Sequence, residues 1–195
     1  IGVSVDEQKD HKKWLEALEK EGLEGDDIIG IISKKFLDTE TIIVTGDRDS
    51  FQLVDDSTSV YFTKKGTSDV KIINPKELKI EYGVTPSQFI DLKALMGDTA
   101  DNIPGVPGIG EKTATNLIVR FGSIENAYGH VEEIKPNRAK EALKAHYDMA
   151  EMSKKLATID IDCDYDYDWE KAKLGDIYTP EAYSFLKRLE FKNML

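Results

Sequence analysis

The sequence is poor in the residues that mark secreted, membrane-spanning and thiol-based metal proteins. It has one cysteine, Cys163, and three histidines among 195 residues, so it can form neither an internal disulfide nor a Cys/His metal motif. No stretch is apolar over enough residues to span a membrane. Residues 1–5 lack the basic-then-apolar build of a signal peptide. These absences favour a reducing, cytoplasmic setting.

Basic residues are also scarce: 26 Lys and Arg face 37 Asp and Glu, which gives a net charge of −11. This balance argues against a generic basic protein that coats DNA. It is compatible with a site that binds divalent cations, because clustered carboxylates repel one another until such cations neutralise them. The composition, 40% hydrophobic and 32% charged, is ordinary for a globular protein. At 195 residues the chain is long enough for one sizeable core, or for a core with a helical appendage.

The most informative stretch is residues 97–114, G-D-T-A-D-N-I-P-G-V-P-G-I-G-E-K-T-A. Its first half carries Asp98 and Asp101, which share one side if the segment turns helically. Its second half alternates glycines, which permit a positive φ and a close approach of another backbone. These glycines are Gly105, Gly108 and Gly110. The pattern predicts a glycine hairpin.

A helix is expected to follow this hairpin from about Glu111. It would aim free N–H groups and the positive end of its dipole at whatever lies over the loop, and a phosphate suits that position. Lys112 and Thr113 are further candidate phosphate contacts, although Lys112 is equally well explained as a solvated helix residue. We therefore expect a clamp that binds a nucleic-acid backbone without reading sequence. The alternative is a simple tight turn between two packed helices.

The order of elements predicts α/β structure before about residue 85 and helices after it. β-branched and apolar runs indicate strands over residues 41–45, 60–63 and 70–73. Apolar periodicity, Pro75, Pro86, Ser123 and Thr179-Pro180 indicate helices. One helix is expected after residue 6 and another from 26 to 36. Further helices are expected to start at Pro75, at Pro86, after Ser123 and at Thr179-Pro180. One long helix is expected from about 136 to 155. The strict Asp alternation over 159–169 suggests either a cation site or, as the favoured interpretation, a solvated extended edge.

Three separated segments present acids at the ends of predicted elements. One begins a helix, one follows the strand over residues 41–45, taken as buried and parallel, and one precedes the hairpin. Each alone is equally typical of a solvated face or a helix cap. Together they predict one pocket that needs Mg²⁺ or Mn²⁺, with two ions about 4 Å apart for hydrolysing a phosphodiester. The predicted ligands are Glu24, Asp26, Asp27, Asp47, Asp49, Asp98 and Asp101. The candidates for catalysis among them are Asp26, Asp27, Asp47 and Asp98.

Four segments resemble motifs of the 5′-nuclease family of exonucleases and flap endonucleases. L-E-G-D-D-I-I-G is similar to the family's Y-E-A-D-D, with Gly25 for alanine, and V-T-G-D-R-D-S-F-Q-L to its V-T-G-D-K-D, with Arg48 for lysine. Residues 97–114 match its G-D-x-x-D-N-[IL]-P-G-V-x-G-I-G-x-K-T-A motif nearly throughout. The ending, L-E-F-K-N-M-L, resembles L-E-F-x-S-L-L. The chain looks most like the nuclease domain of bacterial DNA polymerase I.

The resemblance implies a parallel-sheet, PIN-like α/β core over residues 1–85 and a helix-three-turn-helix region over 86–195. It implies metal-dependent 5′-3′ exonuclease and flap endonuclease activity on DNA in primer removal and repair, with an attached polymerase. Glu24, Asp26 and Asp27 would serve the first metal site and the other four acids the second, and K⁺ is a candidate ion at the hairpin. The family's first strand, with its L-I-D-G-N-type motif, and its basic helical arch are absent from the sequence. A catalytically incomplete DNA-binding fragment is therefore one alternative, and a nuclease with a similar core that acts on RNA is a second.

Overall fold

The computed structural model describes residues 22–35, 39–65, 69–165, 175 and 178–191. The chain divides into two compact units, residues 1–163 and 164–195, and each is described by itself. The helix expected after residue 6 lies outside the described residues. The predicted division near residue 85 falls inside the first unit and stays a prediction.

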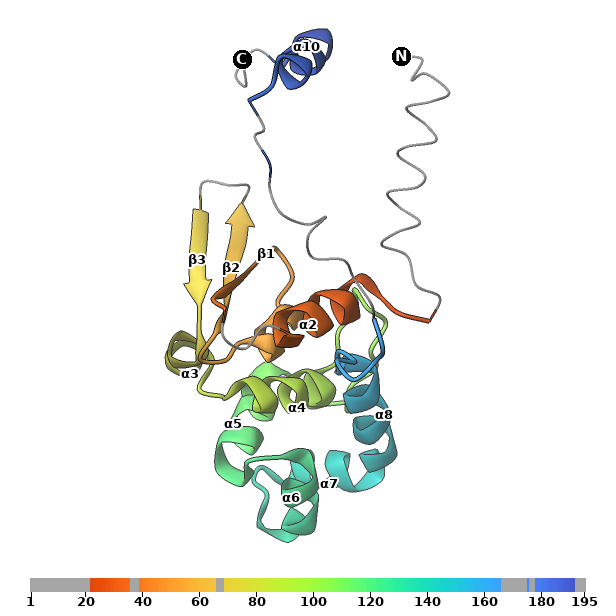
Figure 1. The fold of residues 1–195 in the computed structure, drawn as a ribbon. Helices are drawn as coiled ribbons and strands as arrows, with labels where there is room; N and C mark the ends of the chain where they lie inside the picture. Colours follow the sequence, from red (N-terminus) through yellow and green to blue (C-terminus); the bar gives the residue numbers. More distant parts are fainter. Residues whose placement is uncertain (1–21, 36–38, 66–68, 166–174, 176–177, 192–195) are drawn as a thin grey trace. The chain divides into compact units, whose positions relative to one another are not determined.

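Three strands form the described sheet: β1 (Thr41–Thr45), β2 (Thr58–Lys65) and β3 (Asp69–Ile73), in the order β1-β2-β3 (Figure 1). β1 pairs with β2 in parallel and β2 with β3 antiparallel. All three predicted strands and the parallel pairing are confirmed. The expectation that β1 is fully buried is wrong: Ile43 is 6% exposed but Val44 is 69% exposed, because successive side chains point to opposite faces.

Four short helices precede, connect or follow the strands of this sheet. They are α2 (Gly25–Lys35), the 3₁₀ helix η1 (Asp49–Leu53), α3 (Pro75–Tyr82) and α4 (Pro86–Met96). α3 and α4 begin with proline, as predicted, and Asn74 and Thr85 cap them by accepting backbone N–H groups. The sheet, η1 and α4 share one core, in which the Phe51 ring lies 5.1 Å from Phe62 and 5.4 Å from Phe89 between centroids.

The helical region follows in the same unit. It contains α5 (Glu111–Phe121), α6 (Ile124–Gly129), η2 (Val131–Glu133), α7 (Asn137–Ala145) and α8 (Tyr147–Ala157), and α4 packs against α5 and α8. The single long helix expected over 136–155 is wrong, because His146 leaves helical geometry at φ −133° and separates α7 from α8. Leu143 and Ala150 are both buried and lie seven residues apart, so the apolar periodicity runs on through the break.

The second unit contains one described helix, α10 (Pro180–Arg188), which starts where Thr179-Pro180 predicted it. The Thr179 side chain accepts the N–H of Ala182 and so caps this helix. Among the described residues, none of the helices has the length and apolar character needed to cross a bilayer.

Candidate metal centre and nucleic-acid interface

The first pair of acids is fixed at the carboxyl end of β1. Thr45 Oγ1 accepts the N–H of Asp47 at 3.0 Å, and Asp47 Oδ1 accepts the N–H of Asp49 at 3.0 Å. These two side-chain bonds form the turn between β1 and η1. The turn holds Asp47 and Asp49 at the edge of the sheet where ligands of α/β proteins gather.

A second group of acids begins α2. Asp27 Oδ2 accepts the N–H of Glu24 at 2.9 Å, which caps the helix and keeps negative charge at the favourable end of its dipole. Burial raises the pKa of Asp26, and the negative charges of Asp47, Glu24, Asp27 and Asp101 raise it further. This group and the acids after β1 therefore interact, as the predicted convergence requires.

The third pair lies in a loop that two glycines close. The N–H of Asp98 donates to the carbonyl of Ile103 at 2.9 Å, and the reverse bond is 2.7 Å. Gly97 and Gly105 have φ of +74° and +65°, and a β-carbon on Gly105 would lie 2.4 Å from the Gly97 nitrogen. Only glycine fits this close backbone approach, which fixes the loop carrying Asp98 and Asp101.

The structure brings six of the seven predicted carboxylates to one cavity of about 490 Å³. They are Glu24, Asp26, Asp27, Asp47, Asp49 and Asp101. The seventh, Asp98, lines an adjoining cavity of about 400 Å³, which it shares with Asp47. Asp49, Asp98 and Asp101 each present an oxygen, and these atoms lie within 4.8 Å of one another. Such a set of hard oxygen donors fits Mg²⁺ or Mn²⁺.

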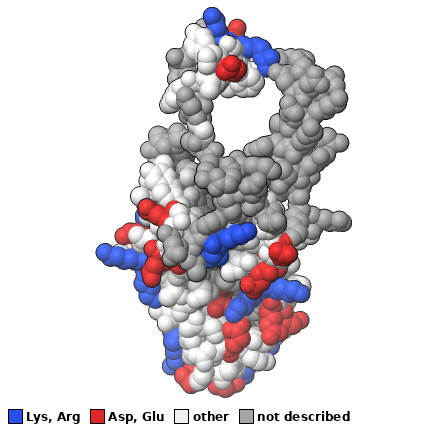
Figure 2. Space-filling view, viewed as in Figure 1, with Lys and Arg blue, Asp and Glu red and all other residues white. Residues whose placement is uncertain are grey.

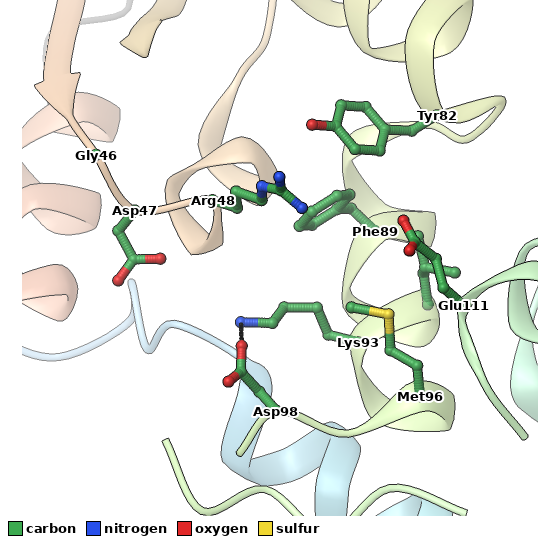
Figure 3. Close-up of a pocket in the computed structure, with 10 residues that line it drawn as sticks. Gly46, Asp47, Arg48, Tyr82, Phe89, Lys93, Met96, Asp98 and Glu111 are labelled. Carbon is green, nitrogen blue, oxygen red and sulfur yellow. Dashed lines mark ion pairs between the residues drawn. The ribbon is translucent and has the colours of Figure 1, made fainter. Parts of the chain in front are cut away.

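A lysine that the sequence analysis missed lies inside this cluster. Lys93 Nζ lies 2.8 Å from Asp98 Oδ2, and Figure 3 shows this ion pair. It also lies 3.7 Å from Asp101 Oδ2 and pairs with Asp49. Its side chain is only 5% exposed. Burial lowers the pKa of Lys93, but the bonds to Asp49 and Asp98 outweigh burial and the pKa is raised, so Lys93 stays charged. The one signal in the sequence is a lysine within the apolar stretch of α4, five residues before Asp98.

Beyond this loop, the hairpin leads into a helix without a side-chain cap. Gly110 precedes α5 and offers no side chain, so no side-chain cap accepts the first N–H groups of the helix. Gly108 is exposed with φ +89°, whereas Gly110 has φ −94°, which other residues also adopt. Of these two hairpin glycines, Gly108 therefore has the positive φ that glycine permits and Gly110 does not. Lys112 is exposed on the first turn, and Thr113 N–H already donates to the Gly110 carbonyl at 3.0 Å.

One predicted DNA contact needs correction. Gly105 is buried, and its N–H donates to Ser153 Oγ at 3.0 Å, so this amide is not available to a phosphate. Arg138, which the sequence analysis did not select, lies beside the hairpin instead. Its Nε and Nη2 are 3.6 and 3.7 Å from the position that a β-carbon on Gly108 would take. The hairpin therefore has a cationic neighbour from α7.

The aspartate-rich segment after α8 contacts the first group of acids through its backbone. The N–H of Asp160 donates to Asp27 Oδ1 at 2.8 Å. The Asp160 carboxylate accepts from its own segment, from the N–H of Asp162 at 3.0 Å and from Cys163 Sγ at 3.1 Å. Asp160 and Asp162 are exposed and Ile159 packs against the core, as expected of a solvated edge. Residues 166–169 of the predicted edge lie outside the described residues.

Acidic and basic side chains are interspersed over the described part of the face drawn in Figure 2. No continuous basic surface covers that part of the face, which agrees with the acidic composition. Local contacts rather than a general positive field are therefore needed to hold an anionic polymer.

Comparisons with known proteins give the family. Residues 11–83 match the model described as 5′-3′ exonuclease, N-terminal resolvase-like domain, and residues 84–179 match 5′-3′ exonuclease, C-terminal SAM fold. The chain is 47% identical over 147 residues to DNA polymerase I of Bacillus caldotenax, covering 74% of this chain and 17% of that protein. It is 37% identical over 185 residues to the thermostable DNA polymerase I of Thermus filiformis, covering 93% and 21%.

Solved structures agree with this assignment. A mutant T5 5′-exonuclease superposes with a TM-score of 0.61 at 26% identity, covering 72% of this chain and 56% of that chain. A T5 flap endonuclease in a pseudo-enzyme-product complex with DNA and metal ions shares the fold, with a TM-score of 0.64 at 24% identity over 80% and 58%. The chain spans about a fifth of the length of its curated relatives. The two family matches together cover residues 11–179, and the chain belongs to the 5′-3′ exonuclease family found in DNA polymerase I.

Proposed function

We propose that this chain is the nuclease domain of a DNA polymerase I and hydrolyses DNA phosphodiesters at 5′ ends or 5′ flaps, in primer removal and repair. The observation that carries the proposal is the gathering of carboxylates from α2, the end of β1 and the loop after α4 around adjoining cavities. A covalently attached polymerase region belongs to the proposal, as does a reducing, cytoplasmic setting.

Two divalent ions, Mg²⁺ or Mn²⁺, are the proposed cofactors. Glu24, Asp26 and Asp27 would hold the first, and Asp47, Asp49, Asp98 and Asp101 the second. Bound ions supply a nucleophilic water and stabilise the leaving oxygen.

Lys93 has its own part in this proposal. Its ammonium group offsets the repulsion among Asp49, Asp98 and Asp101 before any ion arrives. The three carboxylates can therefore lie close together in the folded chain without a bound ion.

The hairpin of Gly108 and Gly110 is the proposed clamp on the duplex. Its backbone amides, the start of α5 and Lys112 would bind phosphates without reading bases, and Thr113 is a candidate through its hydroxyl. Arg138 is added to this group because of its place beside Gly108. K⁺ is a candidate ion at the same turn, since carbonyl and phosphate oxygens suit a hard cation. This clamp would hold the duplex away from the bond being cut.

Incubation of the chain with a labelled 5′-flap substrate, with Mg²⁺ and with chelator, tests the proposal. We expect cleavage near the flap junction that depends on Mg²⁺. Duplex binding with no cleavage at any Mg²⁺ or Mn²⁺ concentration would favour the alternative of a catalytically incomplete DNA-binding fragment. Absence of both binding and cleavage would reject both.

A further inference from the structure

Arg48 stands between two predicted metal ligands in the sequence, yet it lines the cavity of about 400 Å³ that adjoins the main acidic cavity. Its backbone is fixed on both sides: Asp47 Oδ1 accepts the N–H of Asp49 at 3.0 Å, and the Arg48 carbonyl accepts the N–H of Phe51 at 2.9 Å. In Figure 3 the guanidinium extends away from the Asp47 carboxylate, toward the side of the cavity lined by Tyr82 and Phe89. The backbone from which the side chain extends is therefore held in place.

The cavity borders both functional regions of the proposed nuclease. Asp47 and Asp98 line one part of it, and Glu111, the first residue of α5, lines another. Glu111 follows the hairpin directly. A DNA strand that is held at the hairpin and cut at the carboxylates has a continuous backbone between these points. The cavity is lined by carboxylates at one end of this path and by the residue after the hairpin at the other.

Charge distinguishes the two cations in the cavity. Lys93 is paired with three carboxylates, which already neutralise its positive charge, so it is not available to bind another anion. Arg48 makes no ion pair with any residue in the described part of the chain, and it is exposed. A polyanion lying along this cavity therefore meets one cation, Arg48, that has no ion pair among the described residues, beside the acids Asp47 and Glu111.

We propose that Arg48 binds a backbone phosphate of the cleaved strand between the scissile bond and the hairpin. The inference rests on the proposed function, because it takes DNA as the ligand. A guanidinium presents a planar fork of donors that matches two phosphate oxygens, and charge-assisted bonds of this kind are strong. Because the turn fixes its backbone, Arg48 is a positioning residue that sets where the strand lies relative to the carboxylates.

Anisotropy titration of the whole chain with a labelled 5′-flap duplex, with Ca²⁺ present to suppress cutting, measures this contact. Arg48→Gln should weaken binding about tenfold. It should also reduce the slope of log K against log salt concentration by the amount expected for about one lost phosphate contact. Arg48→Lys should recover part of the loss. The matched control is Arg120→Gln, which removes the same charge from an exposed position paired with Glu133, and it should bind like the parent. Equal effects of Arg48→Gln and Arg120→Gln would overturn the inference.

A neutral methylphosphonate placed at successive positions of the cleaved strand locates the phosphate. At one position between the scissile bond and the clamped duplex, the substitution should weaken the parent about tenfold and leave Arg48→Gln unchanged. Additive losses at every position would overturn the inference. If Arg48 instead only balances Glu111, then Glu111→Gln should reverse the loss in Arg48→Gln, and that outcome also overturns it.

The outcomes separate the two proposals. A parent chain that binds no duplex rejects the proposed function and this inference together. A parent that binds and cleaves while Arg48→Gln matches it in affinity, salt dependence and cleavage site rejects the Arg48 contact alone.

Discussion

At the scale of single residues, the pKa values of the acids in this site are shifted in opposite directions. Asp26 has a raised pKa because of burial and its acidic neighbours. Lys93 lowers the pKa of Asp98, and hydrogen bonds from the Ala100 and Asp101 N–H groups support the lowering. Among the described residues, no buried cation pairs with the first group of acids, Glu24, Asp26 and Asp27. The acids around Lys93, in contrast, are partly neutralised by it. The neutralisation is incomplete, because burial raises the pKa of Asp49 despite its bond with Lys93.

Asp47→Asn tests the assignment of the second metal site. Asparagine keeps the oxygen that accepts the Asp49 N–H but removes the charge, so the turn should persist while the ion loses a ligand. Calorimetric titration with Mn²⁺ should show two ions for the parent and one for the variant. The control is Glu141→Gln, on the exposed surface of α7, which should bind two. Unchanged stoichiometry in Asp47→Asn would reject the assignment.

Asp55 gives a pH dependence away from the site. Burial raises its pKa, but bonds from Lys34, Ser57 and Thr58 outweigh burial, and the pKa is lowered well below that of free aspartate. A lowered pKa in the folded state contributes stability that is full above about pH 4, the unfolded value, and is lost as the pH falls further. Asp55→Asn should therefore be less stable than the parent at pH 7, and urea unfolding should show the two converging at acid pH. A constant difference from pH 7 to pH 2 would contradict this.

At the scale of elements, α4 is the helix that positions the site. It carries Lys93, ends at the loop of Asp98 and packs along α8. An ion pair fixes this packing: Lys154 Nζ of α8 lies 2.7 Å from Asp91 Oδ1 of α4, and the Asp91 side chain is 6% exposed. The position of the carboxylate loop thus depends on contacts well away from it.

Lys154→Met tests this contact. It should destabilise the chain by on the order of 3 kcal/mol, because it leaves the Asp91 carboxylate buried without its partner. Adding Asp91→Asn should recover part of that loss, since a neutral amide is less costly to bury. Chemical denaturation of both single variants and the double variant measures the coupling. Additive losses would show that the pair contributes nothing to packing.

The hairpin is the second element with a separable role. Gly108→Val should weaken duplex binding, because its φ of +89° is strained for valine and the side chain would crowd Arg138. The loss should be about equal for two duplexes of unrelated sequence, since backbone amides read no bases. Mn²⁺ binding should be unchanged. Anisotropy titrations that show parental affinity for both duplexes would mean that the hairpin is only a turn.

At the scale of the whole molecule, the sequence predicted the features that depend on neighbouring residues in the chain, which are the helix starts and the strands. Proline and capping residues placed the starts of α3, α4 and α10, and β-branched runs placed the strands. It could not place the break at His146, because the apolar spacing of Leu143 and Ala150 continues across it. It also missed Lys93 and misassigned Gly105, since both depend on contacts between segments: Gly105 fits against Gly97 and bonds to Ser153. Long-range packing, not propensity, decided these positions.

The stability of the whole chain should depend on bound metal, because repulsion among the carboxylates destabilises the metal-free protein and bound ions stabilise it. Ions that bind the folded chain and not the unfolded chain stabilise it, by about 2.7 kcal/mol per site at a concentration one hundred times Kd. Removing a carboxylate from the cluster should have opposite effects in the two conditions. In chelator, Asp47→Asn should unfold at a higher temperature than the parent, because Asp26 loses its main acidic neighbour. With Mn²⁺ the order should reverse, because the parent gains two ions and the variant one. Thermal unfolding of both proteins in both buffers measures this. The same order in the two buffers would mean that Asp47 lies outside the metal site, whatever its place in the cavity.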